Sequence, residues 1–137
     1  MMSGEKINQT EKREVGHYKL RSPNCPEVVD VRQKIKSFAS QIRSGERKGF
    51  SGKKLSTVCA IGIGGSYLGP EFVYEALRYS DSGRKGCEGM KLKFLANVDP
   101  IDFERAVDGI NVEETLFIVV SKTFTTAETM LNARTAR

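Results

Sequence analysis

The chain has 137 residues, 39% of them hydrophobic and 28% charged, with a formal net charge of +5 at pH 7. This length fits one domain, and the composition is ordinary for a soluble cytosolic protein. No apolar run approaches the roughly 20 residues of a membrane span, and the N-terminus lacks the apolar core of a secretory signal. We therefore expect a cytoplasmic protein that does not cross a membrane.

The cysteines and the histidine argue against a metal site. Cys25, Cys59 and Cys87 are widely spaced and form no CxxC pair, and His17 is the single histidine. We expect free thiols, because this set does not match the ligand spacing of zinc sites.

The charge is unevenly distributed along the chain. Residues 1–54 carry a net charge of +7, and residues 55–137 carry −2. A basic segment also occurs in nucleic-acid-binding proteins, but this one lacks interleaved aromatic side chains and zinc-finger spacing. We expect no nucleic-acid partner, and a solvated face or a surface that another segment of a longer chain covers.

The first predicted element is an amphipathic helix. Residues 1–24 are polar and show no period, whereas apolar side chains recur at steps of three and four over 26–43. Pro26 suits the first turn of this helix and Gly45 suits its end. The apolar stripe consists of Val28, Val31, Ile35, Phe38 and Ile42. A glycine-rich loop over 45–52 follows.

Strands and helices then alternate. Residues 55–61, 92–96 and 115–120 read as buried strands. Helices are expected from Pro70, from Pro100 and from near Thr125, and 80–89 reads as a loop. The inner side of the first of these helices is predicted to hold Phe72, Val73, Ala76 and Leu77, and that of the second Phe103, Ala106, Val107 and Ile110.

This order predicts a doubly wound parallel α/β unit over 55–137, preceded by a lead over 1–54 that contains one helix. The last helix reaches Arg137 without a stop signal, and three strands are few for this fold class. We therefore expect a piece of a longer protein.

The first of two candidate ligand loops is rich in glycine and follows the first strand. It runs from Ile61 through Gly62, Gly64, Gly65 and Ser66. Such a turn at the carboxyl end of a parallel strand offers backbone N–H groups and a helix dipole to an anion. A tight turn that binds nothing is the alternative.

Two nucleotide-binding patterns fail at this loop. The G-x-G-x-x-G pattern meets Tyr67 where its third glycine belongs, and the phosphate-loop pattern meets Pro70 in place of lysine. A dinucleotide site also needs an acidic residue after the second strand, where Asn97 stands. We therefore disfavour a nucleotide-dependent oxidoreductase.

The second candidate loop crowds hydroxyl groups around a lysine. Four hydroxyl side chains exceed what one helix cap needs, so the loop predicts a phosphate site. The loop consists of Ser121, Lys122, Thr123, Phe124, Thr125 and Thr126. Thr125 and Glu128 also have the spacing of a capping box, which is an alternative role for those two. Lys122 either contacts the ligand or reaches solvent.

Three other polar residues read as structural. A single histidine such as His17 in a polar stretch is more often solvated than catalytic. Asp99 and Asp102 flank Pro100 and read as helix-start residues, with catalysis or metal binding as the alternative.

At the two loops the sequence resembles the glucose-6-phosphate isomerase family. The stretches 61–70 and 120–129 resemble its first and second phosphosugar loops, and Gly4 to Asn8, followed by Thr10 and Glu11, resembles an upstream segment. Tyr67 and Ala127 are similar to plant and protist members. The chain departs from the family over 14–19, where the family usually has a more apolar run.

The resemblance implies a fold, an activity and a partner. Family members are longer chains with two sugar-isomerase (SIS) domains, each a three-layer parallel α/β fold, and they act as homodimers. They interconvert glucose 6-phosphate and fructose 6-phosphate through an enediol, without a cofactor or a metal. Their catalytic glutamate, histidine and lysine lie beyond the segment present here, so the resemblance implies no catalytic residue and no isomerase activity in residues 1–137 alone.

The family's substrate contacts transfer to residues of both loops. Gly65 and Ser66 match the first-loop contacts, whereas Ser121, Lys122, Thr123 and Thr126 match the contacts to the sugar phosphate. Phe124 and Thr125 lie inside the same motif. The competing function is a non-catalytic SIS module that binds a sugar phosphate, as in some regulators.

Overall fold

The computed structural model describes residues 4–137. Its contacts divide the chain into two compact units, the first ending at Gln41 and the second beginning at Ile42. This division falls inside a long helix, earlier than the boundary at residue 54 that composition predicts.

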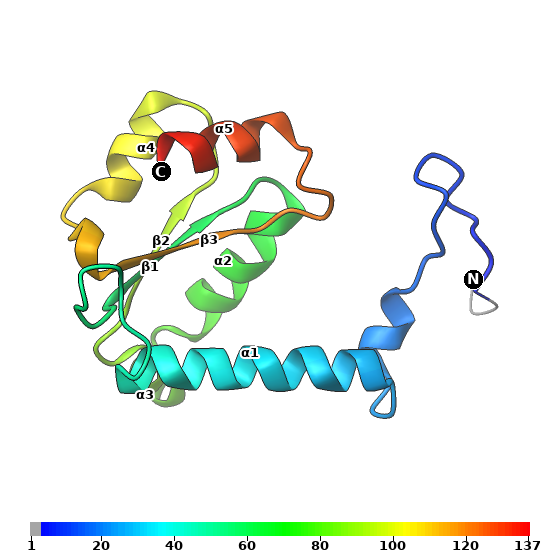
Figure 1. The fold of residues 1–137 in the computed structure, drawn as a ribbon, viewed down its shortest axis with the longest axis horizontal. Helices are drawn as coiled ribbons and strands as arrows, with labels where there is room; N and C mark the ends of the chain where they lie inside the picture. The colour runs from blue at the N-terminus through cyan, green and yellow to red at the C-terminus, as the bar shows by residue number, and fades with distance from the viewer. Residues whose placement is uncertain (1–3) are drawn as a thin grey trace. The chain divides into compact units, whose positions relative to one another are not determined.

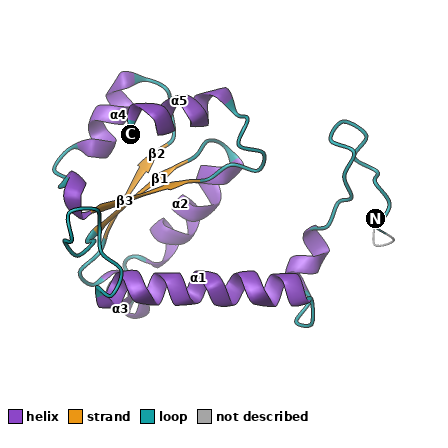
Figure 2. Ribbon diagram, in the orientation of Figure 1, coloured by secondary structure: helices purple, strands orange, loops and turns teal. Residues whose placement is uncertain are grey.

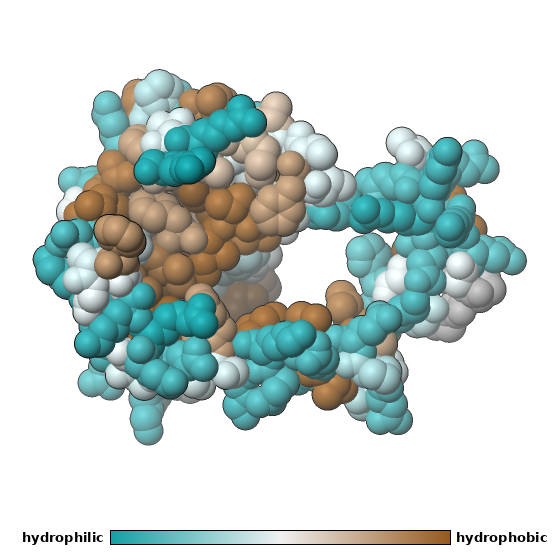
Figure 3. Space-filling model, viewed as in Figure 1, coloured by the Kyte–Doolittle hydropathy of each residue, from teal (hydrophilic) through white to brown (hydrophobic). Residues whose placement is uncertain are grey.

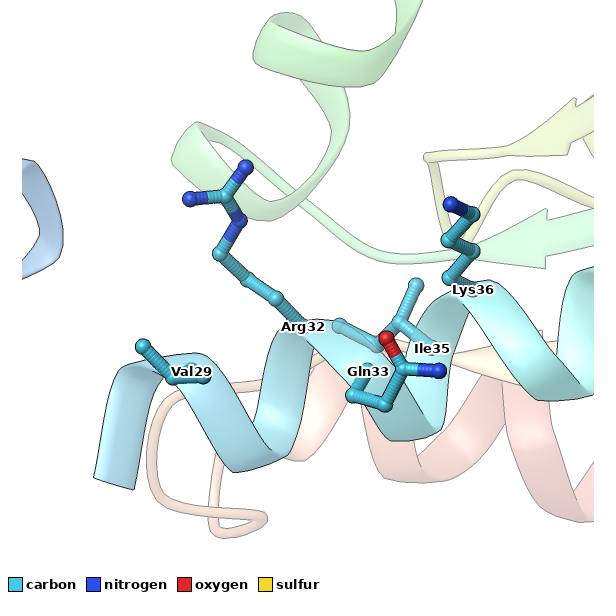
Figure 4. Close-up of a pocket in the computed structure, with 5 residues that line it drawn as sticks. All are labelled: Val29, Arg32, Gln33, Ile35 and Lys36. Atoms are coloured by element: carbon cyan, nitrogen blue, oxygen red, sulfur yellow. The ribbon is translucent and has the colours of Figure 1, made fainter. Parts of the chain in front are cut away.

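The first unit holds the short 3-10 helix η1 (His17–Arg21) and most of helix α1 (Pro26–Ser44). The predicted helix over 26–43 is thus confirmed, and Gly45 ends it with a φ of +81°. Its apolar stripe is largely exposed, with Ile35 63% accessible. Figure 4 shows a shallow hollow on α1, from which Arg32 and Lys36 project on the same side.

A parallel sheet of three strands forms the second unit (Figures 1 and 2). The strands are β1 (Thr57–Ile61), β2 (Lys91–Leu95) and β3 (Thr115–Val119), and their order in the sheet is β2-β1-β3. All three predicted strands are confirmed within two residues. β1 is central, so the strand before the first loop pairs directly with the strand before the second.

Helices cover both faces of this sheet. Figure 1 shows α4 and α5 on one side of it and α2 on the other. The bounds are α2 (Gly65–Leu77), α3 (Asp81–Cys87), α4 (Pro100–Val107), η2 (Val112–Glu114) and α5 (Ala127–Thr135). The expected three-layer α/β architecture is therefore present.

The buried core lies between the sheet and α4. Cys59, Ile61, Leu95 and Ala106 form one cluster, each at most 2% exposed. Side chains alternate between the faces of a strand, so Phe94 beside Leu95 faces the other way and contacts α2 through Tyr67, with ring centroids 5.4 Å apart.

The predicted start and inner face of α2 are wrong. The helix begins at Gly65, and Pro70 lies inside it. Phe72 is 73% exposed and Val73 and Leu77 are about half exposed, whereas Tyr67 and Tyr74 contact Phe94 of the sheet. The inner face is aromatic with a polar rim, so a search for the most apolar stripe selects the opposite side.

The predicted loop over 80–89 contains the short helix α3. Ser80 caps it, because the Ser80 hydroxyl accepts a hydrogen bond from the Gly83 N–H at 3.0 Å. Two glycines in seven residues hide this helix from propensity rules.

Candidate functional site

Both candidate loops leave the sheet at the same edge from neighbouring strands. Ile61 and Val119, the last residues of β1 and β3, are partners in the ladder. The Val120 N–H donates to the Ile61 carbonyl at 2.8 Å, which extends the pairing to the start of the second loop. A phosphate site made of both loops predicts that the strands before them are neighbours, although 55 positions separate Ser66 from Ser121. The pairing of β1 with β3 confirms this adjacency.

The first loop is a tight turn that favours glycine at two positions. Gly62 is buried, and a Cβ there would lie 3.0 Å from the Ser66 carbonyl oxygen. Gly64, the N-cap of α2, has a φ of 57° and a ψ of −124°, which other residues rarely adopt. No side chain caps α2.

Some of the backbone N–H groups at this turn already donate hydrogen bonds to carbonyl groups of the same chain. The N–H groups of Ser66 and Tyr67 bond to the carbonyls of Ile63 and Gly64. The Gly65 N–H precedes the first full turn and has no carbonyl partner within the helix. Gly65 and the half-buried Ser66 therefore stand where the dipole of a 13-residue helix favours an anion.

The second loop is shaped by one of its own hydroxyls. The Ser121 Oγ accepts a hydrogen bond from the Phe124 N–H at 3.0 Å, and Phe124 has a positive φ of 56°. A serine hydroxyl donates and accepts at once, so this bond leaves the Ser121 hydrogen for an external acceptor. The hydroxyls of Thr123 and Thr125 lie 2.6 Å apart, so one donates to the other.

The start of α5 differs from the predicted capping box. Thr126, not Thr125, is the N-cap, and its side chain makes no capping bond. Glu128 then lies in the first turn of the helix instead of at the third capping-box position. Thr125 is hydrogen-bonded with Thr123 instead, so the structure does not show the alternative role of Thr125 and Glu128 as a capping box.

The structure also shows a cavity of about 760 Å³ at the second loop. It extends from the loop along the exposed side of α5, and Ser66 does not line it. Its lining residues are Val98, Phe124, Thr125, Ala127, Glu128, Met130, Leu131 and Arg134. A phosphate site made of both loops also predicts that the Ser66 and Thr123 side chains face one pocket, and this stays a prediction.

At the end of β2, by contrast, the backbone N–H groups already donate hydrogen bonds to a carboxylate. The Asp102 Oδ2 accepts hydrogen bonds from the N–H groups of Ala96 and Asn97, each at 2.9 Å. Asp99 caps α4 through the Ile101 N–H at 2.9 Å, as predicted. Of the three strand ends, this one already holds an internal anion, which leaves the ends of β1 and β3 for a ligand.

Tyr67 lies on the first turn of α2, directly after the loop. A hydrogen bond with Glu71 is the main cause that raises the pKa of Tyr67 to about 12, and burial and the Glu71 charge add to it. The phenol therefore stays protonated at neutral pH, and Tyr67 acts as a packing residue against Phe94.

Two further features are absent among residues 4–137, namely a metal-binding cluster and a membrane-spanning helix. No group of three or more histidine, cysteine or acidic side chains lies close enough together to hold a metal ion. No helix in this described part is long and apolar enough to span a membrane. Cys25, Cys59 and Cys87 are free thiols, as predicted.

Comparisons with known proteins match the whole chain to one family. The phosphoglucose isomerase family model matches residues 1–137. The chain is 52% identical to "Glucose-6-phosphate isomerase, cytosolic" from Arabidopsis thaliana and 51% identical to "Glucose-6-phosphate isomerase, cytosolic 1" from Clarkia arcuata, in both cases over 100% of this chain and 26% of the relative.

A solved structure gives the same result. The crystal structure of a glucose-6-phosphate isomerase from Chlamydia trachomatis matches 93% of this chain and 24% of that chain, with a TM-score of 0.67 and 28% sequence identity. The chain therefore spans about a quarter of the length of the relatives it matches. The family match over all 137 residues shows that the chain belongs to the phosphoglucose isomerase family.

Proposed function

We propose that the full-length protein to which this chain corresponds is a cytosolic glucose-6-phosphate isomerase, which interconverts glucose 6-phosphate and fructose 6-phosphate as a homodimer. The observation that carries this proposal is the adjacency of β1 and β3, because it starts both phosphosugar-like loops from neighbouring strand ends. The names of the relatives from Arabidopsis and Clarkia support the activity and the compartment.

In this proposal, the chain supplies the residues that bind the phosphate group of the sugar phosphate. Two helices, α2 and α5, begin at the loops, and their N-terminal dipoles favour a phosphate dianion. Ser121 retains its hydroxyl hydrogen, and Thr126 makes no capping bond. The proposed binding residues are Gly65, Ser66, Ser121, Lys122, Thr123, Phe124, Thr125 and Thr126.

The proton transfer between the first two carbons of the sugar needs a positioned general base. The family resemblance assigns that base, with the histidine and lysine that open the ring, to segments other than residues 1–137. The phosphate lies at the far end of the substrate from the reacting carbons, so the loops contribute binding and orientation rather than proton transfer.

A ligand titration of this chain tests the proposal. We expect glucose 6-phosphate, but not glucose, to shift the backbone amide resonances of Gly65 and Thr126 saturably. Thr126→Ala removes a charge-assisted hydrogen bond and should weaken binding by about 1.5–3 kcal/mol. Thr135→Ala, at the exposed far end of the same helix, is the matched control and should change the affinity little.

Two outcomes contradict the proposal. Equal shifts with glucose and glucose 6-phosphate would show that the loops do not recognise phosphate. Sugar-phosphate binding without turnover by the full-length protein would favour a non-catalytic module over an isomerase.

A further inference from the structure

The inner face of α5 is polar, unlike that of α4. Thr129 is 2% exposed and Asn132 5%, and both lie on the side of α5 that faces the sheet, together with Ala136. Burying a primary amide costs free energy unless its hydrogen bonds are made. A helix held by small and polar side chains therefore depends on specific bonds for its placement.

Asn132 makes such a bond across the sheet edge. Its Nδ2 donates to the Asn97 backbone carbonyl at 2.9 Å. The Asn97 N–H in turn donates to Asp102 Oδ2 at 2.9 Å, and the Asn97 Oδ1 accepts from the Asp99 N–H at 3.1 Å. The backbone of Asn97 is thus fixed to α4 on one side and to α5 on the other.

We infer that Asn132 is a positioning residue for sugar-phosphate binding, because its bond to the Asn97 carbonyl sets the direction of α5 and so the place of the loop at 121–126. This inference rests on the proposed function and adds a residue outside both loops. Asn132 contacts no ligand in it and acts through the helix.

The helical segment that connects Asn132 to the second loop is short and rigid. Thr126 lies six residues before Asn132, which corresponds to about 9 Å along a helix axis. A tilt of about 10° at Asn132 therefore moves the start of α5 by roughly 1.5 Å. Hydrogen bonds to a phosphate do not survive a displacement of that size without readjustment.

The first test compares two buried substitutions on one face of α5. Asn132→Leu replaces the amide with an apolar side chain of similar shape and so removes the donor. Thr129→Val removes a buried hydroxyl that has no part in the hydrogen bond to Asn97. Both variants and the unchanged chain are titrated with glucose 6-phosphate, followed by the Thr126 amide resonance. We expect Asn132→Leu to weaken binding by about fivefold or more, and Thr129→Val by less than about twofold.

A second variant keeps the test informative where Asn132→Leu folds poorly. In Asn132→Asp the carboxylate repels the Asn97 carbonyl, but the protonated carboxyl donates a hydrogen bond to it. The ratio of the variant's dissociation constant to that of the unchanged chain should therefore fall toward one between pH 8 and pH 5. The second ionisation of the sugar phosphate occurs with both proteins and cancels in this ratio.

The outcomes separate this inference from the proposed function. An unchanged chain that binds glucose 6-phosphate while Asn132→Leu binds equally well, or a ratio for Asn132→Asp that does not vary with pH, overturns the positioning role and leaves the proposed function intact. An unchanged chain that does not bind glucose 6-phosphate overturns both. A selective loss in Asn132→Leu with recovery of Asn132→Asp at low pH supports the role.

Discussion

Phe124 holds a backbone conformation that costs a bulky residue roughly 1–2 kcal/mol, with its φ at 56° in the middle of the second loop. The Ser121 hydroxyl compensates for part of this cost by accepting the Phe124 N–H. Strained residues of this kind persist where the surrounding structure needs them, and they gather at ligand-binding loops. The Ser121 side chain therefore has two uses in the proposed site, since it shapes the loop and keeps a hydrogen for the phosphate.

Tyr67 gives a prediction at the scale of one residue. Its hydrogen bond with Glu71 favours the neutral phenol and raises the pKa to about 12. In Glu71→Gln the negative charge is lost, so the pKa should fall toward the ordinary value near 10. Ultraviolet titration of the phenolate absorbance measures this, with Glu75→Gln on the same helix as the control. An unchanged Tyr67 titration in Glu71→Gln would show that Glu71 is not the cause.

The same shift affects stability at high pH. The folded pKa of Tyr67 lies above the unfolded value, so the unfolded chain loses this proton first as the pH rises. The stabilisation from this phenol is complete below about pH 10 and disappears between pH 10 and 12. In the Glu71→Gln variant this part of the decline should be smaller.

At the scale of elements, the end of β2 depends on Asp102. Asp102→Ala leaves the N–H groups of Ala96 and Asn97 without their acceptor, and we expect a loss of about 1–3 kcal/mol in the free energy of unfolding. Urea denaturation measures the loss. Asp108→Ala, which removes an exposed carboxylate at the other end of α4, is the matched control. Equal losses in the two variants would contradict the specific role of Asp102.

Elements with strong local signals were predictable from the sequence. The period of three and four residues gives α1, and the Asp99-Pro100 pair gives the start of α4. The start of α2 was not predictable from Pro70, because the unusual backbone of Gly64 lets the helix begin five residues earlier. Propensity rules carry no information on which of two mixed faces meets a sheet, and this is why the predicted inner face of α2 is wrong.

The candidate site also has one part that was predictable from the sequence and one part that was not. The neighbouring placement of the loops that hold Ser66 and Ser121 follows from a right-handed crossover, which is a general rule for parallel strands. The roles of Asp102 and Asn132 depend on bonds to backbone groups of another element, at the turn after β2. Local patterns do not show such bonds, and an amide in a short polar helix reads as a surface residue.

At the scale of the whole molecule, much apolar surface is open. Fully buried side chains are few, and Figure 3 shows apolar residues gathered on the visible face of the sheet-bearing unit. On α2, Phe72 is 73% exposed, and on α1, Ile35 is 63% exposed. Open apolar surface of this extent is typical of a binding interface.

This surface predicts the solution behaviour of the 137-residue chain. We expect it to bind an apolar fluorescent dye and to melt below about 45 °C, the lower end of the range for mesophilic domains. Phe72→Ser removes an exposed ring and should reduce dye fluorescence, whereas Ser82→Ala on the exposed helix α3 should not. A sharp transition at high temperature with little dye fluorescence would contradict this expectation.

The central position of β1, next to β3, also determines when the proposed site forms during folding. The first loop is complete in the sequence by Ser66, yet its neighbour in the sheet, β3, begins only at Thr115. Joining strands so far apart in the chain loses loop-closure entropy before any contact compensates for it, which slows folding. During synthesis, nearly fifty further residues must therefore be added after Ser66 before β3 begins, and until then the first loop lacks its neighbouring strand. In the proposed function, sugar-phosphate binding therefore becomes possible only late in the synthesis of this chain.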